Sequence, residues 1–231
     1  MPDKQSIPNL TSALRTHGVE SPDVIRKASG LRLFGKRIKT IVYSTDVAVI
    51  ANCDADAILA VYPWTPNTRI LDAISRVANV PILAGVGGGL TKGLRSATVA
   101  RFAEENGAQA VVLNAPTGFD TLQSVRRIVD IPIFYTIVNQ TPDLLRYIDA
   151  GVDALNIAGG KDTAALVAWA REQLAASHPN FPIIASGGKT DASIQETIAA
   201  GANAITYTAY GMTEKTFHEK MAQYRTEQAQ D

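Results

Sequence analysis

The stretch that decides the fold runs from Phe181 to Gly211 and reads FPIIASGGKTDASIQETIAAGANAITYTAYG. Two short apolar runs, Pro182–Ala185 and Ala204–Tyr207, flank a stretch with helical spacing, Asp191–Ala200. Gly201 follows that stretch and supplies the left-handed residue that commonly ends a helix. A strand, a helix and a second apolar strand in this order are typical of a βα unit on a parallel sheet, whose strands are buried on both faces.

The same alternation occupies the rest of the chain from Ile38 onward. It predicts eight strands, at Ile38–Tyr43, Ala57–Tyr62, Pro81–Val86, Ala110–Asn114, Ile131–Val138, Ala154–Ala158, Pro182–Ala185 and Ala204–Tyr207. The helical stretches between them include Leu94–Asn106, Pro142–Ala150, Thr163–Ala175 and Asp191–Ala200. Eight βα units with short connections close most readily into a (β/α)8 TIM barrel, which is the fold class we predict. An open doubly wound sheet, which usually has fewer strands, is the alternative.

The length of 231 residues suits one large domain rather than two. Residues 1–35 precede the first βα unit and are interpreted as an N-terminal helical extension, with short helices over Ile7–His17 and Ser21–Ser29. Residues 36–231 then form the barrel. The extension would cover the bottom of the barrel or pack against a partner subunit, so the sequence is compatible with a homo-oligomer.

Charge and composition narrow the classes of partner. The chain has 22 Lys and Arg against 22 Asp and Glu, so no net field steers it toward nucleic acid, and we expect no nucleic-acid partner. No apolar run approaches the roughly 18 residues that a membrane span needs, and the N-terminus lacks the apolar core of a signal peptide. With one cysteine, Cys53, no internal disulfide forms. We expect a cytoplasmic protein without membrane contact.

Two loops at the end of the chain carry the main functional signal. The working face of this fold lies at the C-terminal ends of the strands. Ser186, Gly187 and Gly188 follow the seventh predicted strand, and Thr208 and Ala209 follow the eighth. Glycine lets the backbone approach an anion, and backbone N–H groups can then point at its oxygens. These residues are therefore candidates for binding a phosphate, although the glycines would also serve simply to make a tight turn.

Two further glycine clusters follow other strands. Gly159 and Gly160 follow the sixth strand and could extend the same phosphate site, with Lys161 adding positive charge or lying exposed on the loop. Gly87–Gly89 follow the third strand, but they lack the dinucleotide spacing G-x-G-x-x-G. This cluster is interpreted as a lid hinge, as a second anion site for a ligand with two phosphates, or as a flexible loop.

The stretch Phe181–Gly211 resembles the closing quarter of the ribulose-phosphate-binding barrel superfamily. That superfamily includes thiamin-phosphate synthase, indole-glycerol-phosphate synthase and phosphoribosylanthranilate isomerase. The resemblance rests on about thirty residues: an apolar strand, Gly-Gly, a helix, Ala-Gly-Ala, a second apolar strand and small residues. It implies that Gly187, Gly188, Thr208 and Ala209 hold a phosphate through backbone N–H groups.

Candidate catalytic groups are few. Asp46 directly follows the first strand and is the best carboxylate for a general base. Asn114 ends the fourth strand and Asn156 lies inside the sixth, where both would face the barrel mouth and could orient a polar ligand, and Lys161 completes the set. Because buried asparagines must be hydrogen-bonded, a structural role for the two asparagines is equally open. We find no strand lysine placed for a Schiff base and no His or Cys cluster with ligand spacing. No metal and no cofactor are therefore expected.

The sequence leaves two functional hypotheses. The first is an enzyme that acts on a small phosphorylated metabolite, as a phosphosugar-type isomerase, lyase or hydrolase. The second is a ligand-sensing regulatory barrel without catalysis, because Pro81–Gly93 is similar to the glycerol-responsive antiterminator family. The aspartate that this family carries after its third strand would fall near Val86 or Gly87, which are uncharged.

Overall fold

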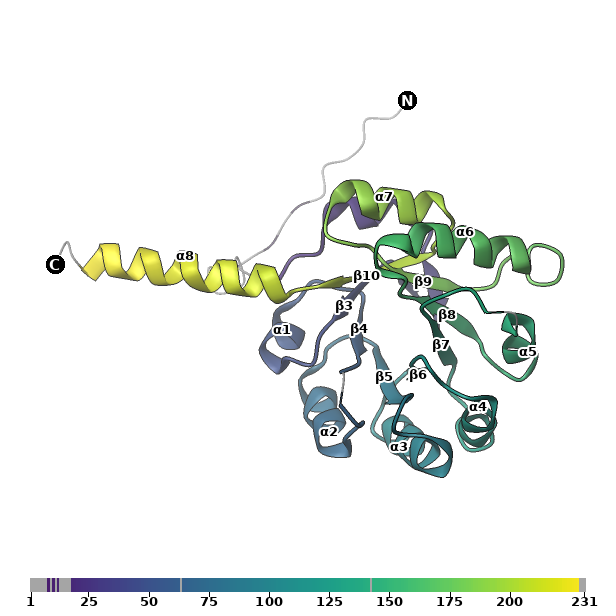
Figure 1. The fold of residues 1–231 in the computed structure, drawn as a ribbon. Helices are drawn as coiled ribbons and strands as arrows, with labels where there is room; N and C mark the ends of the chain where they lie inside the picture. Colours follow the sequence, from purple (N-terminus) through teal and green to yellow (C-terminus); the bar gives the residue numbers. More distant parts are fainter. Residues whose placement is uncertain are drawn as a thin grey trace.

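The computed structural model describes Pro8, Leu10, Ser12 and residues 18–62, 64–141 and 143–228. Eight parallel strands close into a barrel in the order β10-β3-β4-β5-β6-β7-β8-β9 (Figure 1). The strands are β3 (Thr40–Tyr43), β4 (Ala57–Ala60), β5 (Ile82–Gly87), β6 (Ala110–Leu113), β7 (Ile133–Ile137), β8 (Ala154–Ile157), β9 (Ile183–Ser186) and β10 (Ala204–Thr208). The prediction of a (β/α)8 barrel is confirmed, and each of the eight expected strands is present.

The strand boundaries differ from prediction for a simple reason at three places. Pro81, Pro132 and Pro182 precede β5, β7 and β9 instead of lying within them. Proline has no N–H to donate to a neighbouring strand, so the hydrogen-bonded ladder begins at the residue after it.

Helices follow the strands and surround the barrel (Figure 1). They are α1 (Val47–Asn52), α2 (Thr68–Val77), α3 (Gly93–Glu105), α4 (Phe119–Arg126), α5 (Leu144–Asp149), α6 (Thr163–Leu174), α7 (Asp191–Ala199) and α8 (Tyr210–Gln228). One buried apolar layer lies between strands and helices. A second fills the barrel interior and includes Ile41, Leu59, Leu83, Val112, Phe134 and Ile184. The barrel interior is therefore a packed core, and ligands of this fold bind at the C-terminal mouth.

The segment before the barrel is built differently from the prediction. The 3-10 helix η2 (Asp23–Lys27) replaces the expected helix over Ser21–Ser29, and residues 31–38 form an antiparallel hairpin of β1 (Leu31–Leu33) and β2 (Lys36–Ile38). The predicted boundary at residue 35 falls within this hairpin, so residues 31–35 are not helical. The expected helix over Ile7–His17 lies outside the described residues, apart from isolated positions.

The hairpin and η2 belong to the hydrophobic core. Leu33 and Ile38 are buried with the residues of the barrel interior, so the hairpin closes the N-terminal end of the barrel. Val24 and Ile25 of η2 are buried in the outer layer, where η2 packs against α7. The segment 21–38 is thus part of the barrel fold rather than an appendage to it.

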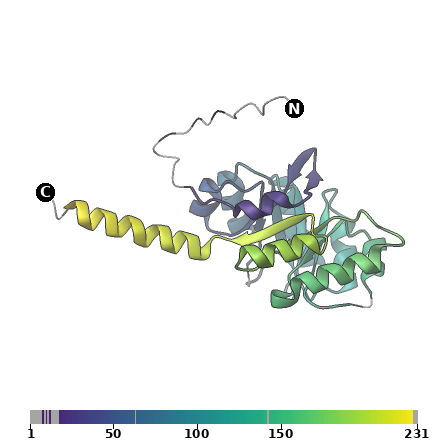
Figure 2. The same cartoon turned by 90° about the horizontal axis from the view of Figure 1, so that it is seen from above.

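The last helix, α8, leaves the barrel and projects away from it (Figures 1 and 2). Phe217 and Tyr224 on this helix are 60% and 54% exposed. Among the helices of the described ranges, none has both the length and the apolar character needed to cross a membrane.

Candidate functional site

Strand alternation decides which side chains face the mouth of the barrel. Val112, Phe134 and Ala154 belong to the interior cluster, and residues two positions further along a strand point to the same side. Asn114, Thr136 and Asn156 follow these three residues at that interval. The two asparagines singled out from the sequence therefore face the inside of the C-terminal end.

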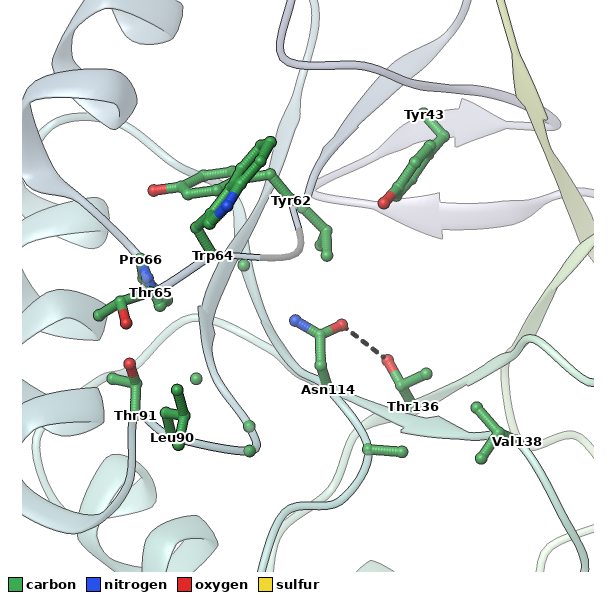
Figure 3. Close-up of a pocket in the computed structure, with 16 residues that line it drawn as sticks. Tyr43, Tyr62, Trp64, Thr65, Pro66, Leu90, Thr91, Asn114, Thr136 and Val138 are labelled. Carbon is green, nitrogen blue, oxygen red and sulfur yellow. Dashed lines mark hydrogen bonds between the residues drawn. The ribbon is translucent and has the colours of Figure 1, made fainter.

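These three side chains form one hydrogen-bonded row. The amide Nδ2 of Asn156 donates to Thr136 Oγ1 over 3.0 Å, and Thr136 Oγ1 donates to Asn114 Oδ1 over 3.4 Å. Within the described ranges, no residue accepts a hydrogen bond from Asn114 Nδ2. This nitrogen lies on the side of Asn114 that faces Tyr62 and Trp64 (Figure 3). The row therefore orients Asn114 so that it offers a donor to the barrel mouth.

A cavity of about 690 Å³ opens above this row, over the ends of β3 to β7. Its lining combines aromatic rings, glycine backbone and neutral polar groups: Tyr43, Val61, Tyr62, Trp64, Thr65, Pro66, Gly85, Gly87, Gly88, Gly89, Leu90, Thr91, Asn114, Ala115, Thr136 and Val138. The volume is that of a typical small-molecule site.

Glycine residues form one wall of the cavity, and at two of these positions a side chain would not fit. A Cβ on Gly85 would lie 2.9 Å from Val61 Cγ2, and a Cβ on Gly88, at φ +129°, would collide with the carbonyl of Asn114. The N–H groups of Gly88 and Gly89 donate to the carbonyls of Thr91 and Pro116 over 3.0 and 3.1 Å. Because these two N–H groups already donate to carbonyls, they are not available to an anion. This argues against the interpretation of Gly87–Gly89 as a second anion site.

Aromatic residues form the opposite wall, and the sequence reasoning missed them. Tyr43 ends β3, while Tyr62 and Trp64 follow β4 (Figure 3). Trp64 is 76% exposed. Burial raises the pKa of both tyrosines above 10, although the backbone N–H of Asn67 acts against this at Tyr62. Both phenols are therefore neutral at physiological pH. The available signal was that Tyr43 and Tyr62 are the last residues of two predicted strands, Ile38–Tyr43 and Ala57–Tyr62.

A second cavity of about 690 Å³ adjoins the first and shares Tyr43, Val61, Tyr62 and Trp64 with it. Its other lining residues are Ser44, Thr45, Asp46, Val49, Thr208, Ala209, Glu214 and Phe217. Asp46 caps α1, because one of its carboxylate oxygens accepts from the N–H groups of Ala48 and Val49 over 2.8 and 3.4 Å. One oxygen of this carboxylate therefore has a capping role, and the role of Asp46 as a general base stays a prediction.

The loop after β9 offers fewer amides to an anion than expected. The N–H of Gly187 donates to the carbonyl of Thr206 over 3.0 Å, so Gly187 cannot use it to hold a phosphate. A Cβ on Gly187 would lie 2.6 Å from Ile205 Cγ2, which explains the glycine by close packing. Gly188 has a φ of +77°, and its N–H has no acceptor among the residues that the structure describes.

Three loops, two of which contain a glycine pair, are neighbours on one rim of the barrel. β8 pairs with β9, and β9 pairs with β10, so Gly159–Gly160, Ser186–Gly188 and Thr208–Ala209 follow adjacent strands. Lys161 lies in the 3-10 helix η3 (Gly160–Asp162), and Lys189 follows Gly188. Both lysines are exposed. No group of three His, Cys, Asp or Glu side chains in the described ranges is arranged to hold a metal ion.

No family profile matches this chain, and no curated protein sequence matches it. Several solved protein structures, in contrast, are similar to it. Dihydrodipicolinate synthase from Bacillus anthracis is 16% identical, with a TM-score of 0.57 over 84% of this chain and 77% of that one. Thiamine phosphate pyrophosphorylase from Pyrococcus furiosus is 15% identical, with a TM-score of 0.55 over 74% and 86%. A prophage protein of the dihydrodipicolinic acid synthase family from E. coli K12 is 15% identical, with a TM-score of 0.58 over 78% and 71%. At these identities the likeness shows that the chain has the (β/α)8 barrel fold.

Proposed function

We propose that the protein is an enzyme that acts on a small phosphorylated metabolite, as a phosphosugar-type isomerase, lyase or hydrolase of the ribulose-phosphate-binding kind. The phosphate would lie on the rim formed by the loops after β8, β9 and β10. The rest of the ligand would extend across the barrel mouth toward Asn114. The observation that carries this proposal is the adjacency of three loops on one rim, two of them glycine-containing, beside an open cavity.

The rim has the chemistry that a phosphate requires, in a smaller set than the sequence suggested. The N–H of Gly188 is available, and Lys161 and Lys189 contribute the cationic groups. Thr208 has an exposed side chain and lines the adjoining cavity. Hydrogen bonds from backbone N–H and ammonium groups to a phosphate are charge-assisted and are about twice as strong as neutral ones. Gly187 is left out of this set because its N–H already donates to the carbonyl of Thr206.

The structural neighbours are consistent with an enzyme. The printed names of the neighbours from B. anthracis and P. furiosus are those of a synthase and a pyrophosphorylase. In this fold, catalytic groups lie at the C-terminal ends of the strands, where Asn114, Asn156 and the rim are found. Asn114 would act on the ligand directly, since its Nδ2 faces the mouth, whereas Asn156 would act through Thr136.

Titration calorimetry with inorganic phosphate tests the phosphate rim. We expect saturable binding that Lys189→Ala weakens about tenfold, equivalent to ~1.4 kcal/mol. Lys92→Ala is the matched control, because Lys92 is an exposed lysine in the loop after β5, next to the glycine wall instead of the rim. Equal weakening by both substitutions, or the absence of saturable binding, would rule out the rim.

Turnover is tested separately on phosphorylated sugars that raise the melting temperature. A ligand at a hundred times its Kd stabilises the native state by about 2.7 kcal/mol. Phosphorus NMR of each such compound incubated with the protein would then reveal isomerisation, cleavage or release of phosphate.

A ligand-sensing barrel without catalysis is the second candidate. The observation in its favour is that the lining of the cavity over β3 to β7, as far as the chain is described, contains no carboxylate, histidine or lysine. A compound that binds tightly and stays unchanged under the NMR assay would support this function over an enzyme.

A further inference from the structure

The cavity over β3 to β7 is uncharged throughout. None of its sixteen lining residues has a charged side chain. Its two tyrosines are neutral at physiological pH because a phenol ordinarily ionises only near pH 10, and burial raises their pKa further. The amides of Gly88 and Gly89, which an anion could otherwise use, are bonded to backbone carbonyls. Burying an anionic group here would leave its charge without a partner, which is costly.

Asn114 gives this neutral cavity one directional polar group. Its Oδ1 already accepts from Thr136, so the side chain presents only its Nδ2 to a ligand. A group that presents only a donor selects an acceptor, and in a cavity without cations that acceptor is a neutral hydroxyl or carbonyl oxygen. The backbone of Asn114 is held independently of the side chain, because its N–H donates to Gly87 and its carbonyl accepts from the Thr117 hydroxyl.

The wall opposite Asn114 is aromatic. Trp64 and Tyr62 lie on one side of the cavity, while Asn114 and Thr136 lie on the other (Figure 3). Aromatic rings cover the apolar face of a ligand while polar groups across the cavity fix its orientation. A carbon skeleton with C–H faces and oxygen substituents satisfies both walls.

We propose that this cavity binds an uncharged, oxygen-bearing carbon skeleton, that Asn114 donates from Nδ2 to one of its oxygens, and that ligands with a second anionic group at this end are excluded. Thr136 is a positioning residue, because its hydroxyl fixes which end of the Asn114 amide faces the cavity. The assignment rests on the proposed function only in that a phosphate on the opposite rim would hold the other end of the ligand.

Two matched phosphorylated probes test whether the cavity over β3 to β7 prefers an uncharged ligand. D-glucose 6-phosphate has an uncharged skeleton beyond its phosphate, whereas 6-phospho-D-gluconate has a carboxylate at the far end. The chain contains two tryptophans, so Trp169→Phe leaves Trp64 as the only fluorescent indole. We expect D-glucose 6-phosphate to quench Trp64 with a Kd about tenfold lower than that of the gluconate, a difference of ~1.4 kcal/mol. Equal or tighter binding of the gluconate, or no quenching by either probe, overturns the assignment.

Substitutions in the row test the roles of Asn114 and Thr136. In the same Trp169→Phe background, Asn114→Ala should raise the Kd of D-glucose 6-phosphate about tenfold, and Asn114→Asp should raise it further because an acceptor replaces the donor. Thr136→Val should raise the Kd, and Thr136→Ser, which keeps the hydroxyl, should restore it. A Kd that stays unchanged in Asn114→Ala, with native circular dichroism, contradicts the role of Asn114. A Kd that rises equally in Thr136→Val and Thr136→Ser contradicts the positioning role.

D-glucose without phosphate separates this inference from the proposed function. If free glucose quenches Trp64 as strongly as its phosphate does, the neutral cavity stands and the phosphate rim fails. If inorganic phosphate binds saturably while no sugar quenches Trp64, the rim stands and the neutral cavity fails.

Discussion

The amide nitrogen Nδ2 of Asn156 lies 3.0 Å from Oγ1 of Thr136, so two buried polar side chains on neighbouring strands are hydrogen-bonded inside the barrel. The same hydroxyl reaches Asn114 on the other side. One threonine therefore links the ends of three strands, β6, β7 and β8.

Thr136→Val should lower the free energy of unfolding by about 1–3 kcal/mol, because it leaves the buried Asn156 amide without its acceptor while keeping the shape of the side chain. Urea denaturation measures this loss. The control is Thr98→Val, since Thr98 is exposed on α3 and its hydroxyl bonds only the carbonyl of Leu94. A loss of the same size in both variants would show that the buried row adds no stability.

Arg171→Met should destabilise the protein by about 2–4 kcal/mol, since it leaves several acceptors without their donor. The half-buried guanidinium of Arg171 donates to the carbonyls of Gly201 and Phe181 and to Asn203 Oδ1, over 2.7–2.9 Å. It thereby joins α6 to the segments that enter β9 and β10. Chemical denaturation is the measurement.

Arg101→Met is the matched control for Arg171. Arg101 lies on the exposed surface of α3, where it pairs with Glu105 over 2.8 Å. Exposed pairs of this kind contribute at most about 1 kcal/mol. If the Arg101 variant loses as much stability as the Arg171 variant, the bridging role assigned to Arg171 is wrong.

Gly88→Ala and Gly89→Ala should differ sharply although the two residues are adjacent. Both have positive φ, +129° and +61°, but a Cβ on Gly88 would collide with the Asn114 carbonyl, whereas nothing lies within 4 Å of a Cβ on Gly89. Gly89→Ala should therefore cost only the left-handed strain of about 1–2 kcal/mol. Gly88→Ala should cost more and also weaken quenching of Trp64. Similar melting temperatures for the two variants would contradict this account of the glycine wall.

Stability should fall above pH 10. Burial raises the pKa of Tyr43, Tyr62, Tyr135 and Tyr207 above the usual 10. The unfolded chain ionises its tyrosines near pH 10, so the stability from burying neutral phenols is complete below that pH and is lost as the pH rises toward the folded-state values. Melting temperatures between pH 8 and 11 measure the loss. Phe substitution at Tyr135 should make the alkaline decline shallower, and an unchanged slope would exclude this tyrosine as a cause.

Much of the fold was predictable because its signals are local. Apolar runs such as Ile183–Ala185, helix-ending glycines such as Gly201 and prolines at strand entries each depend on a few adjacent residues. The hairpin of β1 and β2 was missed, since Leu33 and Ile38 are buried only after the barrel forms an end that they can close.

The site was only partly predictable. Asn114 and Asn156 were found because each is a polar residue within or at the end of a short apolar run that was predicted to be a strand. Trp64 and Tyr62 were missed, since an aromatic pair in a loop carries no periodic signal.

The sequence by itself determined the order of strands and helices and the closure of the barrel, because these follow from local periodicity and chain order. It also indicated the end of the barrel at which a ligand would bind. The tertiary structure decided which groups remain available there. Gly187 donates to Thr206 on β10 and Asp46 caps α1, while the N–H of Gly188 and Asn114 Nδ2 have no hydrogen-bond partner among the described residues. Hydrogen-bond partners are set by strand register and by the packing of helices on the barrel. Neither can be derived from any one segment of the chain.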